Sequence, residues 1–244
     1  VNREGKVALA IHDGTYCAEK HYNEAKVTVV KKKLEDCEIP IPPFPCGEDF
    51  VDPRDGEVYK TTQIGDQCWF GEDLRYDCSK AGYTNVGSAT SWSGTNNCGN
   101  QGSGYNGLLY QWPVAMNGST EEGAQGLCPD GWHVPTDDEW KILEGTVDST
   151  YGVGHAEWDK SEQYRGDDAG TKLKSSEYGF DAKLAGSRYL DGSLNDVGSL
   201  GNWWTSSPSG SLACFRYLNS SLSDVYRYTR SQSFGRSVRC LLGQ

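Results

Sequence analysis

Histidine is the side chain best suited to acid–base and metal chemistry near neutral pH, and this chain contains four of them. The four are His12, His21, His133 and His155. None has a second histidine at the HExxH or HxH spacing that brings two imidazoles to one metal ion. His133 lies between Trp132 and Val134, so its imidazole is expected to be hydrogen-bonded inside the core and not to bind a metal ion. The histidines therefore predict no metal site.

Asp137 and Asp138 are the adjacent acids that most resemble a catalytic pair. They fall where a helix is expected to begin, and the helix dipole favours acids in a first turn without any catalytic role. The chain also lacks the GxSxG motif of hydrolases and the Walker motif of nucleotide-binding loops. We therefore expect a protein that is not an enzyme, with no catalytic residue and no cofactor.

Nine cysteines stand at wide spacings, and no two of them form a CxxC motif. This pattern argues against zinc ribbons and thioredoxin chemistry, and it favours disulfides, which form outside the cytosol. The sequence thus predicts a secreted, extracellular protein at a cell surface. An odd number of cysteines leaves at least one thiol free or bonded to another molecule. We expect a bond between Cys17 and Cys37, and a Gly/Ser/Asn-rich surface loop at 79–106 held by Cys78 and Cys98.

The segment 202–236 is dense in Trp, Tyr, Arg, Asn and Ser, the composition of surfaces that recognise ligands. The candidate ligand-binding residues are Tyr217, Asn219, Tyr226, Arg227 and Tyr228. They should be largely exposed on one face, although strand alternation lets only some of each run point outward. Trp203 and Trp204 are expected in the core instead. Asn117-Gly-Ser and Asn219-Ser-Ser are candidate glycosylation sequons.

The net charge of −11 is unevenly distributed along the chain. Residues 1–39 carry seven basic and seven acidic side chains, so the whole acidic excess lies in the remainder. Such a surface repels nucleic acid and anionic lipid, so we exclude both as partners. No apolar run reaches the length of a membrane-spanning helix, so no membrane insertion is expected. The chain starts at Val1 without a leader-like segment, and we interpret it as a mature, processed form.

The elements that must position these residues begin with an N-terminal β-strand arm over residues 1–39. Residues 6–11 alternate so that Val7, Leu9 and Ile11 share one face, and residues 25–31 form a second strand-like run. So short a segment buries too little surface to be stable alone. A disulfide, the large domain or a neighbouring subunit must therefore hold it, so the arm is either Ig-like or completed by a neighbouring subunit. A Pro-rich stretch at 40–46 should form a stiff spacer.

A helix is predicted where Pro135 and Thr136 precede a short apolar run. Thr136 is the expected N-cap, and Glu139 stands at the capping-box position three residues later. Trp140, Ile142 and Leu143 should form its buried face, with an end near residue 145. A second helix is expected near residues 167–174.

Several blocks from about residue 55 to 242 resemble the FISUMP (major paralogous) domain of bacterial secreted and surface proteins. The blocks are residues 56–74, with a hairpin turn at 65–66, then 107–112, 127–140, 169–174, 179–188, 201–207, 215–218 and 233–240. The resemblance implies a C-type-lectin-like fold, a disulfide between Cys128 and Cys240, and a ligand face in the C-terminal third. The carboxylate–Pro–amide and Trp-Asn-Asp motifs of calcium-dependent sugar binding are absent, so no calcium is expected.

The sequence thus predicts a strand-rich α+β protein with an arm at 1–39, a spacer at 40–52 and a C-type-lectin-like domain at 53–244. Two functions remain open. In the favoured one, the arm donates a strand to other copies of the chain and builds a pilus-like surface fibre that displays the large domain. In the alternative, a monomeric or cell-tethered module binds a glycan or a protein through its C-terminal Tyr/Arg/Asn face.

Overall fold

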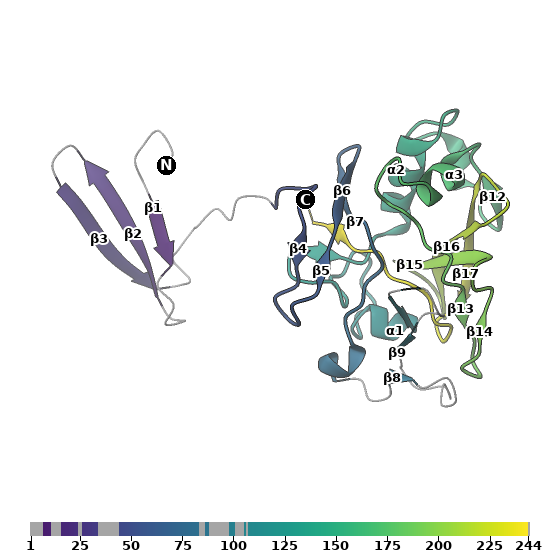
Figure 1. Ribbon diagram of the computed structural model, residues 1–244, viewed down its shortest axis with the longest axis horizontal. Helices are drawn as coiled ribbons and strands as arrows, with labels where there is room; N and C mark the ends of the chain where they lie inside the picture. Colours follow the sequence, from purple (N-terminus) through teal and green to yellow (C-terminus); the bar gives the residue numbers. More distant parts are fainter. Residues whose placement is uncertain are drawn as a thin grey trace. The chain divides into compact units, whose positions relative to one another are not determined.

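Figure 1 shows the computed structural model of the chain. The structure describes residues 7–10, 16–23, 26–33, 44–82, 86–87, 98–100, 105 and 107–243. The chain divides into two compact units, Val1–Pro45 and Cys46–Gln244, and each unit is described by itself.

The first unit contains a three-stranded antiparallel sheet. Its strands are β1 (Val7–Ala10), β2 (Tyr16–Asn23) and β3 (Lys26–Lys33), in the order β1-β2-β3. The sequence predicts the two outer strands but not the central one, because β2 lacks the apolar alternation that marks its neighbours. Ile11, Cys37 and most of the expected Pro-rich spacer lie outside the described residues.

The second unit opens with two short antiparallel pairs, and the second pair shares a sheet with the last strand of the unit. Strands β4 (Phe50–Val51) and β5 (Val58–Tyr59) pair with each other. The next hairpin joins β6 (Thr61–Ile64) to β7 (Gln67–Phe70) at the predicted turn, where Gly65 has a φ of +59°. Two further strands, β11 (Trp132–His133) and β18 (Leu241–Leu242), complete the sheet β11-β18-β7-β6. The two ends of this unit therefore share one sheet.

A second four-stranded antiparallel sheet carries the C-terminal third of the chain. Its order is β12 (Gln163–Arg165), β17 (Val225–Ser231), β16 (Leu212–Asn219) and β15 (Leu200–Ser209). The remaining strands are β8 (Val86–Gly87), β9 (Cys98–Asn100), β10 (Leu108–Tyr110), β13 (Ser187–Arg188) and β14 (Leu194–Asn195). The described part of the chain is thus a strand-rich α+β protein with few helices, as the sequence predicts.

Helix α2 (Asp137–Val147) has the predicted capping box. Its N-cap is Thr136, whose backbone N–H donates to the Glu139 carboxylate at 2.7 Å, while the Thr136 hydroxyl accepts from the Glu139 N–H at 3.1 Å. The helix continues past Gly145, where a Cβ would lie 2.7 Å from the Val153 Cα. Gly145 therefore permits a close backbone approach and does not end the helix.

Trp140 and Leu143 are buried as expected, but Ile142 is 38% exposed, so its predicted place on the buried face is wrong. The other described helices are α1 (Trp112–Ala115), α3 (Ala169–Lys174) and the 3-10 turns η2 (Cys78–Ala81) and η3 (Ala156–Asp159). Figure 1 shows α2 and α3 beside the sheet that contains β15 and β16. No described helix has the length and hydropathy needed to cross a membrane.

The core is an aromatic cluster between α2 and the two larger sheets. The rings of Trp69 and Trp140 meet edge to face at 5.3 Å, and Phe180 lies 5.8 Å from each of them. Trp203 and Trp204 are fully buried, which agrees with their predicted core position. The Trp203 indole N–H donates to Asp73 at 2.8 Å, so its one polar atom is satisfied.

Three disulfides are present among the described residues. They are Cys46–Cys68, Cys78–Cys98 and Cys128–Cys240. The last of these joins segments that lie 112 residues apart in the sequence. Cys214 is a buried free thiol, and burial raises its pKa. The expected Cys17–Cys37 bond lies outside the described residues, because Cys17 is described only as part of strand β2.

Candidate functional site

Strands β16 and β17 sort their side chains onto two chemically different faces. Phe215 stands opposite Tyr228 and Tyr217 opposite Tyr226, while Arg216 stands opposite Arg227. Successive side chains of a strand point to opposite faces. The rings therefore occupy one face of the sheet, and the two arginines occupy the other.

The arginine face is closed by α2 through a buried ion network. Glu144 accepts from the Arg216 Nε at 2.6 Å and from the Arg165 Nη2 at 2.5 Å. Asp137 accepts from the Arg216 Nη1 at 2.7 Å and from the Arg227 Nη2 at 2.7 Å. Burial raises the pKa of Asp137, but the attraction of Arg216 and the hydrogen bonds from both arginines outweigh it and hold the pKa below its ordinary value. This face attaches the helix to the sheet.

Arg227 therefore does not share the face of the tyrosines with which the sequence analysis grouped it. Its side chain points toward Asp137 because it alternates with Tyr226 and Tyr228 along β17. Asn219 is also engaged elsewhere, since its side-chain oxygen accepts from the N–H of Ser221 at 2.9 Å and from its hydroxyl at 2.8 Å. Both residues maintain the fold around the site.

The aromatic face is a stack of partly buried tyrosines. The rings of Tyr217 and Tyr226 stack at 4.5 Å, and Tyr164 meets Tyr226 edge to face at 4.8 Å. The Tyr226 hydroxyl donates to the Glu162 carbonyl at 2.7 Å. Burial raises the pKa of Tyr217 and of Tyr226, so both phenols are neutral and can donate hydrogen bonds. The rings are half-buried and not largely exposed as expected, because they cover one another.

This face opens into a pocket of about 300 Å³. Its aromatic lining is Tyr189, Phe215, Tyr217, Tyr226, Tyr228 and Phe234. Its polar lining is Ser187, Asp196, Asn202, Arg230 and Arg236. A concave site with aromatic walls and a few polar groups is the usual form of a small-ligand site. Three of the five sequence-predicted residues, Tyr217, Tyr226 and Tyr228, contribute to it.

The sequence analysis missed the polar residues of this pocket. Asn202, Arg230 and Arg236 lie within the segment 202–236, but none of them was chosen as a candidate ligand-binding residue. Asp196 and Tyr189 come from the region of β13 and β14, outside the segment searched for a binding face. The available signal for Arg236 was a positively charged residue in a segment, residues 233–240, that was expected to be part of the fold.

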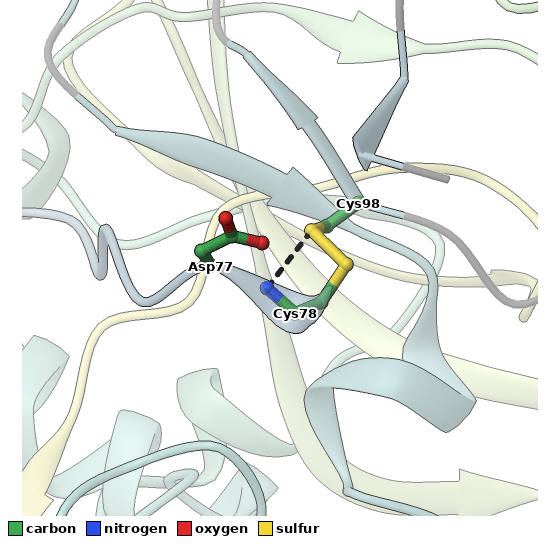
Figure 2. A group of neighbouring side chains, drawn as sticks. All are labelled: Asp77, Cys78 and Cys98. Atoms are coloured by element: carbon green, nitrogen blue, oxygen red, sulfur yellow. Dashed lines mark hydrogen bonds between the residues drawn. A yellow bond between two sulfur atoms is a disulfide. The ribbon is translucent and has the colours of Figure 1, made fainter. Parts of the chain in front are cut away.

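One described group of side chains has the spacing of a metal site. Asp77, Cys78 and Cys98 place ligand atoms within 4.8 Å of one another. Figure 2 shows that the two sulfurs are joined in a disulfide and that the Cys78 N–H donates to the Cys98 Sγ, at 3.3 Å. Zinc and related metals bind cysteine as thiolate, and a disulfide offers none. This group serves to staple the chain.

The described histidines of the large unit have structural partners. The His133 Nε2 lies 2.9 Å from the Glu139 carboxylate, and the His155 Nδ1 accepts from the Glu157 N–H at 3.1 Å. His133 is half-buried, so it belongs to the cap of α2 and not to the deep core that its neighbours suggest.

The remaining sequence-predicted residues lie outside the pocket. Asn117 is exposed in a turn with a φ of +50°, and Asn219 is half-buried, so the first sequon is the more accessible one. Val7 and Leu9 lie in β1, where they stand opposite Lys20 and Ala18 of β2.

Comparison with known proteins gives one match. The model of a family described as the Fibrobacter succinogenes major domain matches residues 62–241. No curated protein and no solved structure matches the chain.

Proposed function

Because this chain belongs to the Fibrobacter succinogenes major domain family, whose model matches most of its length, we propose that it is an extracellular binding protein and not an enzyme. Its large unit, of C-type-lectin-like fold, captures a ligand. The three described disulfides support an oxidising compartment outside the cytosol. The observation that carries the proposal is the aromatic pocket beside β15, β16 and β17.

The shape and lining of the pocket favour a glycan as the ligand. A volume of about 300 Å³ holds one or two small rings, whereas a protein partner usually needs a broad contact surface. Tyrosine rings bind the apolar faces of sugars, and their hydroxyls donate or accept hydrogen bonds. Asn202 and Ser187 add neutral polar groups to the lining. The pocket therefore suits one sugar residue of a longer chain.

Replacing Tyr217 by alanine should weaken glycan binding about tenfold or more, because central aromatic residues supply much of the binding free energy. The measurement is binding of the full chain and of Tyr217→Ala to an array of immobilised glycans, followed by calorimetry on the best binder. Tyr164→Ala is the matched control, since Tyr164 contacts the same ring cluster but does not line the pocket.

If Tyr217→Ala and Tyr164→Ala lose the same amount of glycan binding, the rings affect binding only by stabilising the fold. A wild-type chain that binds no glycan but binds a protein would replace the glycan with a protein ligand. Circular dichroism of each variant checks that the fold is retained.

We propose assembly into a surface fibre as a second function, on the basis of the N-terminal unit. β1 is an outer strand of the sheet β1-β2-β3, and an outer strand can pair with a strand from another chain. Because β1 already pairs with β2 of its own chain, this contact uses the outer edge of β1 and not an unpaired arm. A head-to-tail contact of this kind is heterologous and builds a filament from copies of the chain.

Deleting residues 1–12 should abolish this assembly, because it removes the whole of β1. Light scattering and negative-stain electron microscopy at matched concentrations measure the length of any filament. Filaments of unchanged length from the deleted chain would contradict assembly through β1, and the binding function would then stand alone.

A further inference from the structure

Arg236 is a buried cation in the pocket lining without a carboxylate partner among the described residues. It is 4% exposed, and its Nη1 donates to the Asn202 Oδ1 at 2.8 Å and to the Ser187 Oγ at 3.3 Å. Both acceptors are neutral. Its buried Nε has no hydrogen-bond partner in the described part of the chain. Burial lowers the pKa of Arg236 to about 9, so the cation persists at neutral pH in surroundings that disfavour it.

Three other buried arginines of the large unit, Arg165, Arg216 and Arg239, are neutralised by carboxylates. Arg165 and Arg216 pair with Glu144, and Arg239 pairs with Asp73 at 2.7 Å. A buried charge is costly unless an opposite charge and hydrogen bonds compensate it. Arg236 lines the pocket of the aromatic face and differs from these three, because it has no carboxylate partner among the described residues.

Aromatic rings hold the Arg236 guanidinium in place. Its carbon lies 3.4 Å from the ring centre of Phe215, 4.9 Å from that of Trp204 and 5.8 Å from that of Phe234. Such cation–π contacts compensate part of the cost of burial and leave the charge without a counter-ion. The guanidinium is therefore fixed before any ligand arrives, which reduces the entropy cost of binding.

A second arginine lines the same pocket. Arg230 is exposed, and its guanidinium carbon lies 5.7 Å from the ring centres of Tyr228 and of Phe234. Asp196, also exposed, is the acid in the lining, and it forms no ion pair with either arginine. Two cations and one acid thus give the pocket a positive lining in a chain whose net charge is −11.

We propose that the pocket binds an anionic sugar, whose carboxylate or sulfate group pairs with Arg236. The inference rests on the glycan-binding function proposed above and adds the charge of the ligand. The anionic group supplies the counter-ion that Arg236 lacks, Arg230 attracts it at the pocket lining, and the tyrosine rings contact the sugar ring. Neutral sugars leave the buried cation uncompensated and bind more weakly.

The experiment compares matched immobilised probes on the full chain: neutral oligosaccharides, their uronic-acid counterparts, methyl esters of those acids, and sulfated forms. The acidic probes should bind about tenfold or more tightly than the neutral ones, because a desolvated charge pair is strengthened in a low-dielectric site. Methyl esterification should remove this preference without any change in the protein. The uronic-acid and sulfated arms identify which anion the pocket takes.

Two variants test the arginines. Arg230→Gln, at an exposed position, should fold normally and weaken the binding of the acidic probes severalfold. Arg236→Gln should abolish the preference for acidic over neutral probes. Arg54→Gln is the control, because Arg54 pairs with Asp52 away from this pocket. If Arg236→Gln does not fold, the esterified probes and Arg230→Gln still decide the result.

Equal binding of neutral and acidic probes by the wild-type chain would overturn the anionic ligand and leave the glycan-binding function intact. Binding of no glycan of either kind would overturn both proposals. A preference for acid that survives in Arg236→Gln and in Arg230→Gln would place the anion elsewhere and overturn the role assigned to this pocket.

Discussion

Replacing Glu144 by glutamine should lower the free energy of unfolding by about 3–5 kcal/mol, because it leaves two buried guanidinium groups without a full counter-charge. Glu144 and Arg216 are fully buried, and the Glu144 carboxylate accepts from both Arg216 and Arg165. The loss should appear as a lower urea midpoint with an unchanged slope, measured by circular dichroism.

Asp138→Asn is the matched control for this substitution. Asp138 lies on the same helix, but its side chain is 83% exposed and pairs only with Lys141 among the described residues. Its removal should change stability by no more than about 0.5 kcal/mol. If Glu144→Gln costs less than about 1 kcal/mol, the ion pairs of Glu144 contribute little, and Asp137 and the aromatic core hold α2 to the sheet.

Removing the Cys128–Cys240 bond with a double alanine variant should cost about 4–5 kcal/mol in the chain-entropy description, because the bond closes a loop of 112 residues. The double variant is needed because a single substitution leaves a new free thiol in one of the two segments that the bond joins. Thermal and urea unfolding, with the other disulfides intact, measure the loss.

The Cys78–Cys98 bond provides the comparison, since it closes a loop of only 20 residues. The same description gives about 3 kcal/mol for that loop, so the long-range bond should be the more costly one to remove. Equal losses of stability from the Cys128/Cys240 and the Cys78/Cys98 double alanine variants would show that loop length does not determine how much each bond stabilises the fold. In the folded chain, buried Cys214, whose pKa is raised by burial, should not exchange with either bond.

The features that the sequence predicts correctly depend on neighbouring residues. The capping box needs Thr136 and Glu139 alone, and the hairpin between β6 and β7 needs a glycine that tolerates a positive φ at position 65. The burial of Trp203 and Trp204 follows from their size and apolar surface. These local features can be predicted from the sequence because they depend little on which other elements pack against the segment.

The features that the sequence does not reveal depend on which elements meet in space. Arg227 and Tyr226 are adjacent in the chain, yet the alternation along β17 sends one to the ion network and the other to the pocket. Ile142 has the spacing of a core residue but is exposed, because no described element covers that side of α2 fully. Arg236 becomes a candidate site residue only once the pocket beside it is known.

The position of β18 has a consequence for how the protein is made. Leu241 stands opposite Trp69, the Phe70 N–H donates to the Cys240 carbonyl at 2.9 Å, and the Leu74 N–H donates to the Val238 carbonyl at 2.9 Å. The sheet therefore cannot close until residues 238–242 have left the ribosome, and β7, already paired with β6, must wait for its second partner, synthesised some 170 residues later. During that interval the growing chain stays open. An open chain is the form that a translocation channel can thread, so this topology is compatible with the extracellular location proposed above.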